Sequence, residues 1–496
     1  MGDEVVEFTA TALTVAGVLL LISSLFSRVS ARLGVPVSLF FLLIGMLAGS
    51  DGPGGIWFDS FEIAYACGTV ALVVILFAGG LSTDTSHMKG ALAPASVLAT
   101  IGVVGVAGLT ALGARALGLS WPEALLVGAI LSPTDAAAVF AVLDGVPLRR
   151  RVAMTIELES GLNDPVAVIL TVAAALNLAG RGEPGWSLAG QIVVQLLVGA
   201  GLGLGTGAAG RWLLRRIRPS TPALYPAVTM SIAFVAYGVA TQLGGSGFLS
   251  VYLAGITVGQ GGLPHRLILK RFHESQAWLA QIGMFLMLGL LIFPSELPHI
   301  AGHGLFLALY LALVARPVAV ALCLLPFRFN WREIACIAWV GLRGAVPIVL
   351  ATIPVLMIGA ALAPARNIID QFDLVFFAVV VGAIIPGATV RWLPKLLGLE
   401  DPAPPVPAVA IDITSDHPLR ETQLNVLIGQ GSPACGQTLA ELDLPSEVVV
   451  MGIVRGDRLL PPRGATRLEA GDHAVVLCAP ALAGAVTAIF SPVASA

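Results

Sequence analysis

Long apolar stretches alternate with short polar segments along the first four-fifths of the chain. A membrane-spanning helix needs roughly 20 mostly apolar residues, and the pattern predicts about thirteen such helices. We expect them near residues 9–27, 35–50, 63–81, 91–117, 122–143, 152–179, 187–211, 222–243, 247–262, 273–293, 302–327, 332–359 and 370–394.

The pattern changes after residue 398. Residues 1–398 form the predicted membrane domain, and the prolines within 399–414 predict a semi-rigid linker. Residues 415–492 contain shorter alternating runs, with strands expected over 423–428, 448–454 and 474–478 and a short helix over 439–442. These runs predict a small cytoplasmic α+β domain.

Composition agrees with a membrane protein. The chain is 57% hydrophobic and only 11% charged, whereas soluble domains carry about 25 per cent charged residues. We therefore predict an α-helical polytopic membrane protein embedded in a lipid bilayer. The formal charge of −3, without a basic tract, gives no reason to expect a nucleic-acid partner.

Lysines and arginines alternate between the two sets of predicted loops. Most fall in one set, for example at 149–151 and 215–218, while the opposite loops hold only Arg115, Arg181 and Arg366. Because cytoplasmic loops are enriched in positive charge, the pattern predicts an outside N-terminus and a cytoplasmic C-terminal domain. In a bacterium this corresponds to the plasma (inner) membrane.

A dense polar motif interrupts the sixth expected span, at residues 157–165. On a helix Ser160 and Asp164 share one face, and Pro165 leaves a backbone carbonyl oxygen nearby without its helical donor. Ionisable side chains at bilayer depth are costly and usually functional. Oxygen ligands around one carboxylate suit a hard monovalent cation or a competing proton; the alternative is a polar patch satisfied by neighbouring helices. Glu157 fits either a cytoplasmic funnel or a surface ion pair.

Two other spans contain helix-breaking residues at corresponding positions. The fifth contains Ser132-Pro133-Thr134-Asp135, and the twelfth contains Gly341-Leu342-Arg343-Gly344 before Pro347. Interrupted helices at matching places in two halves indicate an inverted-repeat secondary transporter with its site at the midplane. Asp135 could neutralise the positive end of one half-helix, and Arg343 could lie near a negative end.

Arg343 needs a partner because guanidinium does not lose its proton in proteins. We expect a structural ion pair with Glu159, bridged by the amide of Asn163, which leaves Asp164 free to exchange its ligand. Arg316 is a second intramembrane cation, and a structural counter-charge is its expected role.

These motifs identify a resemblance over residues 5–398. The chain resembles bacterial monovalent cation:proton antiporters of the NhaP type, in the cation:proton antiporter-1 family. The resemblance implies an antiporter fold of about thirteen helices with a dimerisation domain and a mobile core, and it implies a homodimer. It also implies that a monovalent cation or proton binds at Asp164, with Ser160 and Thr134 assisting and Asn163 beside them.

The same resemblance implies a structural pair of Glu159 and Arg343 steadied by Asn163. Many relatives carry an acid at the position of Ala78, so this chain lacks one candidate cation ligand. The tail, through Thr438–Leu442 and Leu468–Asp472, resembles the C-terminal subdomain of RCK domains, which also goes by the name TrkA-C. It suggests regulation by an unknown nucleotide or other small ligand, and no cofactor is otherwise expected.

The resulting hypothesis is an electroneutral potassium/proton antiporter that works by alternating access, with cation and proton competing for Asp164. A sodium/proton antiporter of the same family is the near alternative. A ligand-gated cation channel is the alternative from another class. An enzyme is not expected, because no HExxH or GxSxG motif accompanies the carboxylates.

Overall fold

The computed structural model describes most of the chain as two compact units, Met1–Asp401 and Pro402–Ala496. The described residues are 2–33, 36–83, 88, 90–135, 138–139, 148–182, 184–217, 224–260, 266–358, 365–390, 392–400, 422–456 and 458–490. The expected linker over 399–414 lies almost wholly outside them.

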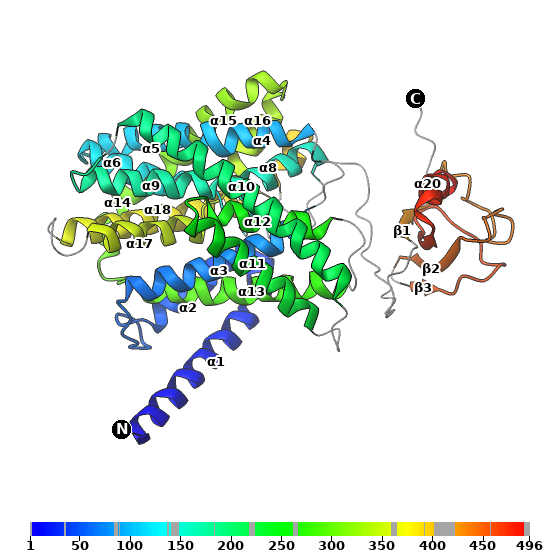
Figure 1. Cartoon of the computed structure of the whole chain (residues 1–496), viewed down its shortest axis with the longest axis horizontal. Coiled ribbons are helices and arrows are strands. Elements are labelled where there is room, and N and C mark those ends of the chain that lie inside the picture. Colours follow the sequence, from blue (N-terminus) through cyan, green and yellow to red (C-terminus); the bar gives the residue numbers. More distant parts are fainter. Residues whose placement is uncertain are drawn as a thin grey trace. The chain divides into compact units, whose positions relative to one another are not determined.

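Helices make up the first unit (Figure 1). In chain order they are α1 (Gly2–Leu33), α2 (Val37–Ala48), α3 (Phe61–Ser82), α4 (Leu92–Val97), α5 (Val103–Ala116), α6 (Trp121–Ile130), α8 (Arg150–Leu162), α9 (Asp164–Leu178), α10 (Gly185–Arg216), α11 (Leu224–Gln242), α12 (Gly247–Gly259), α13 (Arg266–Leu290), α14 (Leu297–Tyr310), α15 (Arg316–Leu324), α16 (Trp331–Val340), α17 (Ala345–Ile358), α18 (Ala365–Thr389) and α19 (Leu393–Leu397).

The predicted spans fall on these helices. Among the described residues, seven helices or continuous runs are long and apolar enough to cross a membrane. An eighth is the bent pair α16 and α17, whose halves meet at 54°. The shorter apolar helices α2, α6 and α12 occupy three further predicted spans. The end of the fifth predicted span, beyond Val139, lies outside the described residues.

The two predicted helix breaks cross each other. One follows α6 and the other lies between α16 and α17, and the backbone N–H of Asp135 donates to the carbonyl of Leu342 at 3.0 Å. Pro133 cannot donate a backbone hydrogen bond, and glycine lowers helix stability, so both segments leave the helical conformation. The crossing brings two distant parts of the sequence together within the bundle.

Tight contact between α3 and α12 depends on glycine. A Cβ added at Gly255 would lie 2.6 Å from the carbonyl oxygen of Phe77, and one at Gly259 would lie 2.6 Å from that of Leu81. Small residues allow helix backbones in a membrane to approach this closely. The backbones of the two helices are therefore in direct contact.

The second unit holds a four-stranded antiparallel sheet in the order β1-β4-β2-β3. Its elements, shown in Figure 1, are β1 (Thr422–Leu427), β2 (Val449–Arg455), β3 (Arg458–Leu460), β4 (His473–Cys478) and α20 (Ala483–Phe490). The three expected strands are present, and β3 and α20 were not expected. The short helix expected over 439–442 is wrong: this segment is a turn in which the N–H groups of Glu441 and Leu442 both donate to Thr438.

Candidate cation site at the crossing helix breaks

Asp164 lies at the junction of α8 and α9. Asn163 ends α8 in a near-helical conformation, and Pro165 occupies the first turn of α9, where its missing N–H leaves no helical bond unmade. Asp164 is 2% exposed. Neither of its carboxylate oxygens has a hydrogen-bond partner among the described residues.

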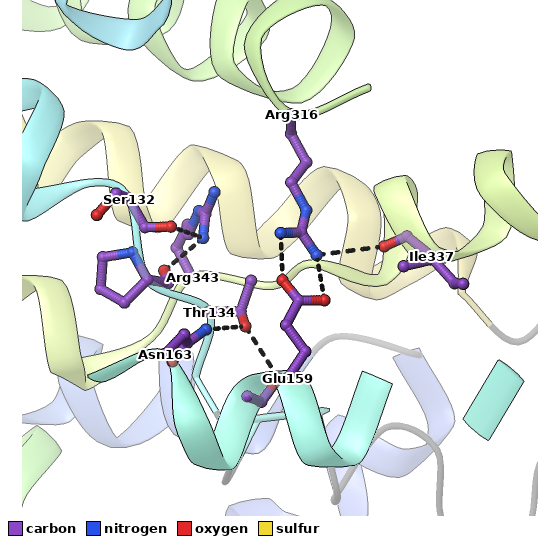
Figure 2. Close-up of polar contacts among 9 residues, drawn as sticks. Ser132, Thr134, Glu159, Asn163, Arg316, Ile337 and Arg343 are labelled. Atoms are coloured by element: carbon purple, nitrogen blue, oxygen red, sulfur yellow. Dashed lines mark hydrogen bonds and ion pairs between the residues drawn. The ribbon is translucent and has the colours of Figure 1, made fainter. Parts of the chain in front are cut away.

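Three polar side chains gather beside this junction. The hydroxyls of Thr134 and Ser160 are 2.9 Å apart, and the Asn163 amide nitrogen donates to Thr134 at 2.6 Å (Figure 2). The Asn163 amide oxygen has no partner in the described part of the chain. A buried, unpaired carboxylate is unfavourable. The group therefore offers several oxygens that could hold a monovalent cation, and an acid that could hold a proton instead.

The expected pair of Glu159 and Arg343 is wrong. Glu159 instead pairs with Arg316: Nη2 of the guanidinium donates to Oε2 at 2.9 Å, and Nη1 donates to Oε1. Figure 2 shows this two-pronged contact, with Arg316 reaching Glu159 from a separate helix. Both side chains are nearly inaccessible to solvent. The role expected for Arg316, a structural counter-charge, thus has a specific partner.

Arg343 binds backbone oxygens instead of a carboxylate. Its Nη1 donates to the carbonyl of Ser132 at 2.9 Å and to that of Pro133. These carbonyls follow the C-terminal end of α6, where the helix dipole is negative. The sequence also predicted that Arg343 could lie near the negative end of a half-helix. This contact agrees with that prediction (Figure 2).

Asp135 binds the start of α17, just as Arg343 binds the carbonyls after α6. Its Oδ2 accepts from the N–H of Ala345, the first residue of α17, at 2.9 Å, and its Oδ1 accepts from the N–H of Ala138 at 3.3 Å. A carboxylate at a helix N-terminus stabilises the positive end of the dipole. A Cβ added at Gly344 would overlap this carboxylate, and one at Gly341 would lie 2.6 Å from Nε of Arg316.

Comparison with known proteins identifies the family. Residues 17–396 match the family described as "Sodium/hydrogen exchanger, transmembrane". The chain belongs to this sodium/hydrogen exchanger family. Residues 425–491 match the TrkA-C domain, in agreement with the resemblance of the tail.

This exchanger-family chain has relatives that cover most of its length. It is 40% identical to the K(+)/H(+) antiporter NhaP of Alkalimonas amylolytica over 94% of this chain and 80% of that protein. It is 41% identical to the K(+)/H(+) antiporter NhaP2 of Shewanella baltica over 93% of this chain and 80% of that protein. Its fold matches the sodium proton antiporter MjNhaP1 from Methanocaldococcus jannaschii with a TM-score of 0.66, 24% identity and coverage of 78% and 99% of the two chains.

The structure of this exchanger brings together most of the residues expected from the sequence. The side chains of Thr134, Ser160 and Asn163 meet, although they come from two segments of the chain, and Asp164 directly follows Asn163. The pairing of Arg316 was missed. The sequence shows that two arginines and several acids share the membrane interior, but sequence spacing does not decide which pair meets.

Proposed function

We propose that the chain is an electroneutral potassium/proton antiporter and that Asp164 is its exchange site. The observation that carries this proposal is the buried Asp164 carboxylate, whose oxygens lack partners in the described chain. Glu159, Asp135 and Arg343 are each held by other groups. Asp164 is therefore the acid in this cluster that is left to exchange its ligand.

The stoichiometry follows from competition. When Asp164 is ionised, its oxygens hold a dehydrated cation together with Ser160, Thr134 and the Asn163 amide oxygen. When it is protonated, the negative charge that held the cation is gone. One carboxylate can carry either one proton or one monovalent cation, and Asn163 cannot titrate. Each cycle then exchanges one charge for one charge.

Potassium is proposed as the cation because the relatives that are about 40% identical are named K(+)/H(+) antiporters. Sodium remains the second candidate, because the structural relative is named a sodium proton antiporter. Potassium and sodium ions differ in size and in the free energy needed to remove their water. Transport measurements decide which of the two ions the protein prefers.

The test is exchange in proteoliposomes that contain a pH-sensitive dye. Chlorides of potassium, sodium, rubidium and lithium are added in turn, with and without residues after Gly398. Potassium should give the fastest proton movement, and Asp164→Asn should abolish it. Asp59→Asn is the matched control, because Asp59 is an exposed acid in the same unit. Retained exchange in Asp164→Asn would remove Asp164 from the mechanism.

A ligand-gated channel is distinguished by current. An electroneutral exchanger passes no steady current across a planar bilayer, whereas a channel passes one. The TrkA-C domain is proposed to regulate exchange through a nucleotide or other small ligand, and its removal should change the rate without changing the ion order.

The proposed setting is a bacterial plasma membrane, with the N-terminus outside and the C-terminal domain in the cytoplasm. The distribution of arginine and lysine supports this orientation. We also propose a homodimer, which the resemblance to NhaP-type antiporters implies, and Val193, Val194 and Leu197 on the exposed face of α10 are suitable positions to probe it. Cross-linking through single cysteines on this face, in membranes, tests the dimer.

A further inference from the structure

One face of α8 leads from partial solvent exposure to the proposed exchange site. With 3.6 residues per turn, Glu157, Gly161 and Asp164 fall on the same side of the helical run formed by α8 and α9. Glu157 is partly exposed, whereas Gly161 and Asp164 are buried. We call these three positions the α8 lane. Along the lane, exposure falls from partial at Glu157 to none of note at the buried Gly161 and Asp164.

The side chain at this point is Tyr252 of α12. A Cβ added at Gly161 would lie 2.7 and 2.8 Å from Cε1 and Cε2 of the tyrosine ring and closer still to Cζ. Real Cβ atoms essentially never approach other heavy atoms this closely. The ring thus occupies the space where any other residue at 161 would place its side chain. Tyr252 itself is fully buried.

Tyr252 is held by a different set of helices from Gly161. Its hydroxyl lies 3.4 Å from the hydroxyl of Thr83, which follows the last residue of α3. Thr83 in turn donates to the carbonyl of Gly79 at 2.8 Å. Because α3 and α12 are packed backbone to backbone, the ring is fixed to this pair. A movement of α3 and α12 relative to α8 would therefore change the contact between the ring and Gly161.

We propose that Tyr252 is the gate of the α8 lane and that its ring packs against Gly161 when the gate is closed. With the ring on Gly161, the route from Glu157 to Asp164 is closed; when the ring leaves, Asp164 is open to that side. This inference rests on the proposed function of Asp164. It assigns to Tyr252 control of access and no part in holding the cation, because no described contact joins the tyrosine to Asp164.

The first test is a double-mutant cycle in the proteoliposome assay. Gly161→Ala should slow exchange about tenfold or more, because the inserted methyl group overlaps the Tyr252 ring and hinders the return to the closed state that each exchange cycle needs. Tyr252→Ala should restore the Gly161→Ala variant to within about threefold of the Tyr252→Ala single variant. Gly205→Ala in α10 is the matched control, since a Cβ there meets nothing within 4 Å. Equal slowing with and without the tyrosine would overturn the proposal.

The second test reads the gate directly and does not depend on Gly161→Ala folding. Purified protein is treated with a water-soluble carbodiimide and an amine, and modification of Asp164 is followed by mass spectrometry. Tyr252→Ala should raise the modification rate about tenfold, while Tyr252→Phe keeps the ring and should stay within about threefold of the unmodified sequence. An unchanged rate in Tyr252→Ala would refute the gate.

The two proposals fail in different ways. If the unmodified sequence shows no exchange with any of the four cations, the proposed function fails. If it exchanges, but Tyr252→Ala neither relieves Gly161→Ala nor exposes Asp164, only the gate fails. Potassium chloride should slow the modification of Asp164 in Tyr252→Ala if both proposals hold.

Discussion

Removing Arg316 should destabilise the protein by leaving a buried carboxylate unpaired. Glu159 and Arg316 are both nearly inaccessible and share two hydrogen bonds. Breaking a buried ion pair by truncating one partner costs about 3–5 kcal/mol, whereas replacing both partners by apolar residues of similar volume is often nearly neutral. Arg316→Met and Glu159→Met should therefore each be strongly destabilising, and the double variant should recover most of the loss.

The coupling energy measured in a double-mutant cycle distinguishes the pair of Glu159 and Arg316 from the pair of Glu159 and Arg343, which was expected from the sequence. Arg343 donates to carbonyl oxygens, so Arg343→Met loses hydrogen bonds worth roughly 1.5–3 kcal/mol each without unpairing Glu159. Combining Arg343→Met with Glu159→Met should show a smaller coupling than the Glu159 and Arg316 cycle, because Arg343 donates to the carbonyls of Ser132 and Pro133 and no described hydrogen bond joins it to Glu159. The Glu159 and Arg316 cycle should show a coupling of about 3 kcal/mol or more.

The assay is unfolding of the purified protein in detergent, with the four variants of each cycle measured under identical conditions. Binding of dye by unfolded protein and loss of monodispersity give two independent transition midpoints. Variants that cannot be purified are compared by the fraction that remains monodisperse after extraction. A larger coupling of Glu159 to Arg343 than to Arg316 would refute the assignment of the ion pair.

Three further predictions concern the helix breaks and the second unit. Gly344→Ala should reduce exchange and stability because its Cβ would overlap the Asp135 carboxylate; purified yield and dye-based exchange measure both, and wild-type values would contradict it. Asp135→Asn should cost about 1–2 kcal/mol, because an uncharged amide interacts less with the N-terminus of α17, and a shift in the unfolding midpoint measures this. Burial lowers the pKa of His473 below its usual 6.5. The unfolded chain therefore takes up this proton first, and the stability of the second unit should fall as pH drops below about 6.5. Hydrogen exchange in β4 of the full chain, corrected for the pH dependence of the chemistry, should show this loss of protection, and His473→Gln should remove that part of it.

Local chemistry made much of the membrane unit predictable from the sequence. Apolar length indicates the spans, because the bilayer allows only chain segments whose backbone hydrogen bonds are satisfied internally. Proline and glycine indicate the two breaks, because they remove backbone donors or favour non-helical conformations. The short turn near 439–442 was misassigned, because hydrophobic spacing over four residues does not distinguish a turn from a helix.

The tertiary structure decided which charges meet. Arg316 and Arg343 are both arginines at membrane depth, and the sequence contains no local signal that assigns Glu159 to one of them. The crossing of the breaks brings Arg343 against the carbonyls after α6, while α15 carries Arg316 to Glu159. Likewise, the need for glycine at position 161 is explained only by the tertiary structure, in which the ring of Tyr252 occupies the space of a side chain there. Long-range pairing depends on how whole helices pack, and that information is distributed over the chain instead of residing in a motif.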